Sequence, residues 1–234
     1  MKLLIWDFDG TLGYREGGAW TASLFEVMQR GAPESGVGFE QLQVYTHSGF
    51  PWHVPEEPHL HLSTAELWWA ALEKTFARAY RCVGFEAAQA QILARKVRLT
   101  YLNPARWRRF DDVVPVLDAL TADGWLHVIL SNHVPELPDI VQAVGLTAHF
   151  ARVFNSADLG YEKPHPRIFE LALDEMHVGE TGRAAGNVWM IGDSYRADVQ
   201  GAEAAGIPAI LVRRHHPDAL RFAETLEEVP AMLA

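Results

Sequence analysis

Cysteine is nearly absent from this sequence of 234 residues, which contains only Cys82. One thiol cannot form a disulfide within the chain or a cluster of thiolate metal ligands, so we expect a protein of a reducing compartment, the cytoplasm. Long apolar runs are missing too, since no stretch approaches the ~20 apolar residues of a transmembrane helix. The apolar residues 3–6 are too few for the core of a secretory signal, and Asp7 follows them at once.

Positive charge is also scarce. The chain has 20 Lys and Arg residues against 30 Asp and Glu residues, which gives a formal net charge of −10. Such an acidic chain is poorly suited to bind nucleic acid or an anionic membrane through its overall charge, so we expect neither as a partner. Hydrophobic residues make up 49% of the chain, which is typical of a globular protein, and the length suits one large domain or one domain with an insertion.

Short apolar runs alternate with helical patterns along most of the chain. The runs, which are almost entirely apolar, are residues 3–6, 126–130, 188–191 and 209–212, with a weaker candidate at 152–155. Such runs are typical of strands that a parallel sheet buries on both faces. The helical patterns between them are residues 113–122, 135–144, 166–176 and 196–205. The alternation predicts an α/β fold, a Rossmann-like parallel sheet with helices on both faces.

About a hundred residues after the first strand break this alternation. Helical patterns cover residues 20–30 and 85–102, and a third helix is predicted to begin at Ser63, which would form a capping box with Glu66. We therefore predict an inserted, all-helical cap domain on the α/β core. The predicted boundaries are residues 14–105 for the cap, and residues 1–13 and 106–234 for the core.

An irregular segment rich in Gly, Pro and His lies between two of these helices. Its second half, residues 47–62, has the traits of a substrate loop, because it is long and contains three prolines. Trp52 and His53 are side chains of this loop that could contact a ligand. We expect the loop to influence which substrates the protein accepts.

Polar side chains follow the predicted strands where each strand ends. They are Asp7 and Asp9 after the first strand, Ser131 and Asn132 after the second, Lys163 after the weak one, and Asp193 and Asp198 after the next. In an open parallel sheet these strand ends form one ligand-binding edge. Carboxylates gathered there repel one another unless a hard cation such as Mg²⁺ binds them, and a lysine and a hydroxyl can then hold a phosphoryl group.

These residues belong to four motifs in a fixed order. The motifs are D-F-D-G-T-L at residues 7–12, S-N at 131–132, E-K-P-H-P at 162–166 and G-D-S-Y-R-A-D at 192–198. The set resembles the signature motifs of the haloacid dehalogenase-like hydrolase superfamily, and the insertion between the first two motifs resembles the helical cap of that family. Four motifs in register make this resemblance specific.

The resemblance implies catalytic and metal-binding roles. Asp7 would be the nucleophile, and Asp9 would be the general acid and then the general base. Asp193 would bind Mg²⁺ together with Asp7 and the backbone carbonyl of Asp9. Asp198 would be either a further Mg²⁺ ligand, directly or through water, or the partner that positions Lys163.

The resemblance also implies a phosphate site. Ser131 and Lys163 would hold the phosphoryl oxygens, helped by backbone N–H groups of the first loop. Asn132 would contribute chiefly through its backbone amide. The substrate would be a small phosphorylated metabolite, and we expect the protein to be a monomer or a homodimer.

The predicted function is a Mg²⁺-dependent hydrolase that removes phosphate through an aspartyl-phosphate on Asp7. Three alternatives stay open. A phosphomutase of the same fold can share the Asp-x-Asp pattern. A 2-haloacid dehalogenase needs the nucleophile, but usually lacks a carboxylate at the position of Asp9. A non-catalytic phosphoacceptor or binding protein could also place Asp, Ser and Lys at strand ends, although receiver domains have no cap.

Overall fold

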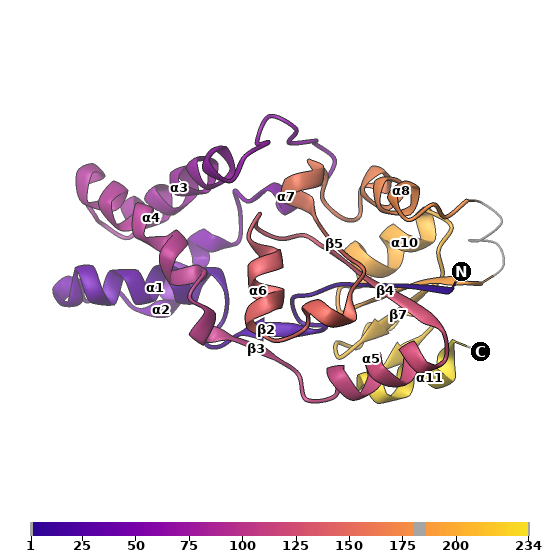
Figure 1. Ribbon diagram of the computed structural model, residues 1–234. Helices are drawn as coiled ribbons and strands as arrows, with labels where there is room; N and C mark the ends of the chain where they lie inside the picture. Colours follow the sequence, from indigo (N-terminus) through magenta and orange to yellow (C-terminus); the bar gives the residue numbers. More distant parts are fainter. Residues whose placement is uncertain (1, 180–185, 234) are drawn as a thin grey trace.

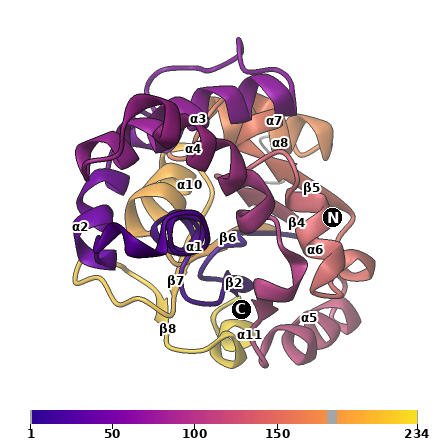
Figure 2. The ribbon, with the colours of Figure 1, turned by 90° about the vertical axis from the view of Figure 1, so that its left-hand side faces the viewer.

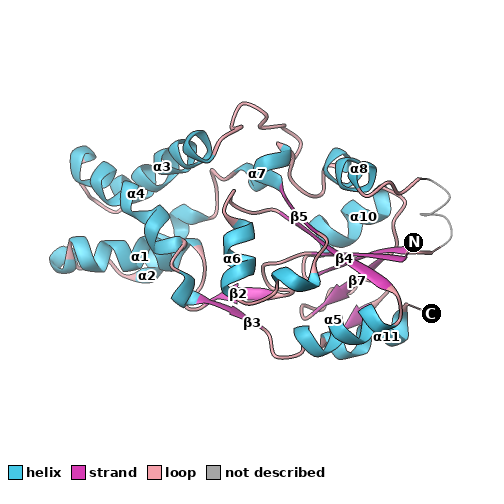
Figure 3. Cartoon of the chain, viewed as in Figure 1, coloured by secondary structure: helices cyan, strands magenta, loops and turns pink. Residues whose placement is uncertain are grey.

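A parallel sheet of six strands forms the centre of the computed structural model, which describes residues 2–179 and 186–233 (Figures 1 and 3). Its strands are β1 (Lys2–Trp6), β4 (Trp125–Ser131), β5 (Arg152–Asn155), β6 (Val188–Gly192), β7 (Ala209–Val212) and β8 (Phe222–Ala223). Their order is β5-β4-β1-β6-β7-β8, and every pairing is parallel. The predicted Rossmann-like sheet is confirmed.

The sheet is buried on both faces, as the apolar runs predicted. Successive side chains of β1 alternate between two hydrophobic clusters: Leu4 and Trp6 belong to one, and Leu3 and Ile5 to the other. Helices α5 (Val113–Ala122), α6 (Leu137–Ala143) and α11 (Val229–Met232) pack into the first cluster. Helices α8 (Pro166–Glu175) and α10 (Gly201–Ala204) pack into the second. Helices therefore cover both faces.

Two predicted helices differ from those observed. The pattern at residues 196–205 is divided into a π-helical segment, Tyr195–Gln200, and the short α10. The N-cap predicted at Ser63 is wrong by one residue, since Thr64 adopts the extended conformation of a cap and its hydroxyl accepts a hydrogen bond from Leu67 N. A further helix, α7 (Ser156–Leu159), follows β5 directly.

A helical insertion follows β1 (Figure 1, left-hand side). Its helices are α1 (Trp20–Gly31), α2 (Phe39–Gln43), α3 (Ala65–Cys82) and α4 (Ala87–Tyr101). Figure 2 shows these helices in front of the sheet, beyond the carboxyl end of β1. Short 3₁₀ turns occur at Pro33–Ser35, Val44–Thr46, Pro51–His53, Pro104–Arg106, Thr147–His149 and Leu226–Glu228. No described helix is long and apolar enough to cross a bilayer.

Two short strands lie where the chain enters and leaves the insertion. β2 (Gly13–Arg15) pairs antiparallel with β3 (Trp107–Arg109), and neither was predicted. The buried guanidinium of Arg15 links the start and the end of the insertion, because it donates hydrogen bonds to the carbonyls of Gly18, at 2.9 Å, and Thr100, at 2.9 Å. The predicted boundaries at 13/14 and 105/106 lie in or beside this strand pair, and the division into two domains stays a prediction.

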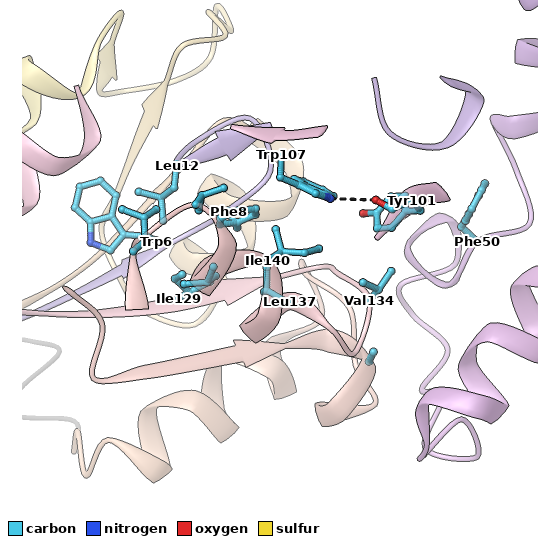
Figure 4. Packing of buried hydrophobic residues seen from close by; sticks show 14 of the residues in the cluster. Trp6, Phe8, Leu12, Phe50, Tyr101, Trp107, Ile129, Val134, Leu137 and Ile140 are labelled. Atoms are coloured by element: carbon cyan, nitrogen blue, oxygen red, sulfur yellow. Dashed lines mark hydrogen bonds between the residues drawn. The ribbon is translucent and has the colours of Figure 1, made fainter. Parts of the chain in front are cut away.

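One hydrophobic cluster continues from the sheet into the insertion (Figure 4). Phe8 in the loop after β1 packs against Trp107, and the Trp107 indole N–H donates to the carbonyl of Tyr101 at 3.0 Å. Beyond Tyr101 the cluster reaches Phe50, which is fully enclosed by the insertion. This shared packing holds the insertion over the carboxyl edge of the sheet.

Candidate active site

The carboxyl ends of the central strands open into a cavity of about 530 Å³. All seven residues predicted for the site line it: Asp7, Asp9, Ser131, Asn132, Lys163, Asp193 and Asp198. Because β1 lies between β4 and β6, the residues that follow these three strands are neighbours although they are far apart in sequence. The structure thus brings the whole predicted set together.

Asp7 is the meeting point of two donors. Ser131 Oγ and Lys163 Nζ each lie 2.8 Å from the same oxygen, Asp7 Oδ1. Burial alone would lower the pKa of Lys163, but the carboxylates of Asp198 and Asp7 outweigh burial and raise it, so the ammonium group stays charged. A hydroxyl and a fixed cation therefore converge beside the carboxylate at the end of β1.

Asp198 faces Lys163 rather than open space. Its Oδ1 accepts a hydrogen bond of 2.6 Å from Lys163 Nζ, and its Oδ2 accepts one of 2.9 Å from Ser194 N. Gly192 makes this approach possible, because a Cβ atom there would lie 2.2 Å from the Asp198 carboxyl group. The arrangement is the one that a positioning role for Asp198 requires, and the role itself stays a prediction.

Asn132 braces the loop that carries Lys163. Its amide nitrogen donates to the Lys163 carbonyl at 2.9 Å, and its Oδ1 accepts from the Lys163 backbone N–H at 2.6 Å. The side chain of Asn132 therefore faces the backbone of Lys163. The predicted phosphate contact of its backbone amide stays a prediction.

Three carboxylates form a group that fits a divalent cation. Oxygens of Asp7, Asp193 and Asp198 lie within 4.8 Å of one another. Gly10, with φ of +81°, lets the first loop pass so close to Asp193 that a Cβ atom would lie 2.3 Å from Oδ2. Oxygen donors of this kind suit Mg²⁺. The Asp9 side chain is outside this described group, and its predicted contribution to the metal is through the backbone.

The carboxylates of this group are electrostatically strained. Burial, with the charge of Asp7, raises the pKa of Asp193 to about 7. Burial also raises the pKa of Asp198 to about 6, although Lys163 opposes the increase. Both increases report the cost of holding negative charges close together in a buried place, a cost that a bound cation relieves.

Asp9 stands apart from this group and contacts a pair of residues that the motifs did not indicate. His133 Nε2 lies 3.5 Å from Asp9 Oδ2 and 3.4 Å from the Tyr101 hydroxyl. Desolvation, with the charges of Asp7 and Asp193, raises the pKa of Asp9 well above its ordinary value, even though its side chain is 39% exposed. Burial lowers the pKa of His133 to about 4, so the imidazole is a neutral partner. Asp9 is therefore biased toward its protonated form.

Sequence reasoning missed these partners for different reasons. His133 directly follows the S-N motif, so its place at a strand end was a usable signal. Tyr101 ends a helix of the insertion, and Arg214, whose Nε lies 3.0 Å from Asp193 Oδ2, follows β7. Nothing local distinguishes Tyr101 or Arg214 from a packing or surface residue.

A buried acid lies next to Lys163. Glu162 is fully buried, and His59 Nε2 of the insertion lies 3.4 Å from its Oε1. Burial raises the pKa of Glu162 to about 8, although the charge of Lys163 opposes this. The neutral carboxyl is therefore the form that the native structure favours.

Replacing Glu162 with glutamine should stabilise the protein more at pH 8 than at pH 5. Between the ordinary pKa of a glutamic acid and about 8, the unfolded chain has lost this proton while the native state keeps it. Stability therefore falls as pH rises through that window, by up to about 1.4 kcal/mol per pH unit. Glutamine, which does not titrate, removes this loss. Urea unfolding from pH 5 to 8 measures the free energy of unfolding of the variant and of the wild type. The contributions of the other carboxyl groups are the same in both proteins, so they cancel in the difference.

Glu203→Gln, at an exposed position of α10, is the matched control for this substitution. It should change the free energy of unfolding little, and by the same amount at each pH. If the free energy of unfolding of Glu162→Gln differs from that of the wild type by the same amount at every pH from 5 to 8, the buried carboxyl does not titrate as described.

Known proteins resemble this chain in sequence. A family model described as haloacid dehalogenase-like hydrolase matches residues 1–206. Haloacid dehalogenase-like hydrolase domain-containing protein 3 of Bos taurus is 34% identical over 159 residues, 67% of this chain and 60% of the relative. A phosphoserine phosphatase of Thermus thermophilus is 33% identical over 142 residues, 58% of this chain and 54% of that protein. The alignments thus span less than two thirds of these relatives.

Solved structures share the fold along the whole chain. The HAD-hydrolase YfnB from Bacillus subtilis, bound to magnesium, has a TM-score of 0.70 at 18% identity, with 99% of this chain and 98% of that chain covered. A 2-haloacid dehalogenase from Pseudomonas syringae has a TM-score of 0.66 at 24% identity, with 100% and 98% covered. At these identities the likeness concerns the fold.

Proposed function

We propose an activity for this chain, which belongs to the haloacid dehalogenase-like hydrolase family: it is a Mg²⁺-dependent phosphatase that hydrolyses a small phosphate monoester through an aspartyl-phosphate on Asp7. One observation carries the proposal. Ser131 Oγ and Lys163 Nζ converge on the same oxygen of Asp7, at 2.8 Å each, while a second carboxyl, Asp9, lines the same cavity. The phosphatase relative supports the same reaction type.

The first half-reaction transfers the phosphoryl group to the protein. Ser131 and Lys163, which now contact Asp7, hold two phosphoryl oxygens and align phosphorus with the Asp7 carboxylate. A carboxylate oxygen forms the new bond to phosphorus while the ester bond opposite breaks. Asp9 gives its proton to the departing oxygen, and the raised pKa of Asp9 suits this role.

The second half-reaction releases phosphate. Asp9, now a carboxylate, takes a proton from a water molecule as the water oxygen attacks phosphorus. The bond between Asp7 and phosphorus breaks, which restores both aspartates. Asp7 and Asp193, with the carbonyl of Asp9, would hold Mg²⁺, which neutralises charge on the phosphoryl group. Asp198 keeps Lys163 in place throughout.

A phosphate-release screen tests the proposal. Purified protein is incubated with a panel of phosphorylated metabolites, with Mg²⁺ and with EDTA, and free phosphate is measured. A parallel assay with a sugar phosphate and a bisphosphate activator detects isomerisation, and one with 2-chloropropionate detects chloride. Phosphate release that needs Mg²⁺ supports the proposal, whereas isomerisation or chloride release without phosphate release replaces it by the corresponding alternative.

Asp193→Asn should raise the Mg²⁺ concentration needed for half-maximal rate by ~10-fold or more, because it removes an anionic oxygen from the carboxylate group. EDTA should silence the wild type. Asp174→Asn, at an exposed position of α8, makes the same change of charge and should keep the wild-type requirement. Full wild-type activity after exhaustive EDTA treatment would contradict a metal role for this group.

A further inference from the structure

The cavity has two chemically different sides. The side formed by the sheet edge carries the charged residues already described. The side formed by the insertion is mainly aromatic: Trp20, Trp52 and Tyr101 line it, together with Tyr14 and Pro55. A phosphate held at Asp7 therefore directs the rest of its ester toward aromatic rings.

These rings are fixed in place by stacking on one another and on buried rings. The Trp20 and Tyr101 rings stack with centroids 4.2 Å apart and an interplanar angle of 11°. Trp20 also stacks on the buried Phe76, at 5.7 Å and 28°. Trp52 stacks on the buried Phe50, at 4.8 Å and 17°. Rings fixed in this way lose little conformational entropy when a ligand packs against them.

The same side offers little to an anionic leaving group. Among the described residues, Arg15 is the one charged side chain from the insertion and its strand pair that lines the cavity, and it donates to backbone carbonyls and to Glu26. The Tyr101 hydroxyl faces His133. A carboxylate beside this wall would leave water without gaining a new partner, which is costly.

Two arginines of the core also line the cavity, and each has an acidic partner. Arg196 lies 3.1 Å from Glu56, and Arg214 Nε lies 3.0 Å from Asp193. The side chains of both arginines are mostly exposed to solvent.

We propose that the substrate is a phosphate monoester whose leaving group carries a planar aromatic or heteroaromatic ring, and that this ring packs against Trp20 and Trp52. Aromatic pairs prefer offset stacking or edge-to-face contact, and either arrangement extends the existing ring cluster. The cavity is large enough for a phosphate and a ring system. This inference rests on the proposed phosphatase activity and names its substrate class.

Matched esters of primary alcohols test the preference, because their leaving groups differ little in basicity. The probes are 2-phenylethyl phosphate, 2-cyclohexylethyl phosphate, O-phosphoserine and adenosine 5′-monophosphate. For the wild type, kcat/KM for the phenyl ester should exceed that for the cyclohexyl ester by roughly 3- to 10-fold, the range expected for an aromatic contact. It should exceed that for O-phosphoserine by roughly tenfold or more. The adenine ester tells whether a heteroaromatic ring is preferred to a benzene ring.

Variants of the turn Pro51–His53 locate the contact. Trp52→Leu keeps an apolar side chain without a ring, so the phenyl-to-cyclohexyl ratio should fall toward 1, with Trp20 retaining part of the preference, whereas Trp52→Phe should largely keep the ratio. His61→Leu is the matched control, since His61 is exposed, lies further along the same segment and is outside the residues that line the cavity, and it should keep the wild-type ratio. Circular dichroism and thermal melting establish that each variant is folded.

The outcomes separate this inference from the proposed function. If the wild type releases phosphate but prefers O-phosphoserine, or treats the phenyl and cyclohexyl esters alike, the aromatic subsite is wrong and the phosphatase stands. If the wild type releases phosphate from none of the esters, and not from the anhydride acetyl phosphate either, the proposed function is wrong and this inference falls with it. The wild-type comparison decides even if Trp52→Leu does not fold.

Discussion

Asp7→Asn should lower kcat by roughly 10⁴-fold or more, the scale of loss seen when a covalent nucleophile is removed. Asparagine has nearly the size of aspartate, and its carbonyl oxygen can still accept the hydrogen bonds from Ser131 and Lys163. It cannot attack phosphorus, so the aspartyl-phosphate cannot form. Phosphate release with excess enzyme measures the residual rate.

The control for this variant is again Asp174→Asn, which should turn over normally. A trapping experiment adds a direct readout: acid quenching of the wild type during turnover of a ³²P-labelled ester should leave label on the protein, and Asp7→Asn should carry none. Near-normal phosphate release by a folded Asp7→Asn protein would end the covalent mechanism.

Asp9→Asn should slow turnover by ~10²–10⁴-fold, the usual contribution of a general acid–base group, and the loss should depend on the leaving group. The turnover rate should fall most for ethyl phosphate, because its alkoxide leaving group needs a proton. 4-Nitrophenyl phosphate has a stable leaving group, so the rate of aspartyl-phosphate formation should fall less. A burst of 4-nitrophenol should then precede slow hydrolysis of the aspartyl-phosphate. Rapid-mixing measurements of both half-reactions check this.

The dependence of the rate loss on the leaving group distinguishes a general acid from a residue that acts only through its charge. Asp9 contacts His133 and lies close to the charges of Asp7 and Asp193, so its replacement also changes the local field. A change of field alone slows all esters by a similar factor. An equal loss for ethyl and 4-nitrophenyl phosphate, with aspartyl-phosphate formation rate-limiting in both, would remove the acid role from Asp9.

Local sequence patterns predicted much of the fold. The run at residues 209–212 matches β7 at both ends, because a strand buried on both faces shows its whole length as apolar sequence. The weaker run at residues 152–155 matches the edge strand β5, in which Arg152 is exposed. The strand pair β2 and β3 and the two-residue β8 escaped prediction. Strands of two or three residues leave no period to detect, and their pairing depends on partners elsewhere in the chain.

By itself the sequence determined the order of the strands along the chain and the motifs at their ends, and hence Asp7, Ser131, Lys163 and Asp193 as candidates for one site. Those features are local, since each motif sits where a strand must stop. Sequence order does not state which strands become neighbours. The order β5-β4-β1-β6-β7-β8 decided that the motifs meet.

Tertiary structure alone decided what surrounds the motifs. Tyr101 reaches His133, and through it Asp9, only because the insertion packs back over the sheet edge. Trp52 joins the cavity wall, while His53, its neighbour in sequence, does not line the cavity and packs edge-on against Phe50. Such contacts join residues far apart in the chain, where no local spacing records them, and the cap side of the cavity, the side proposed to select the substrate, is built almost entirely from them.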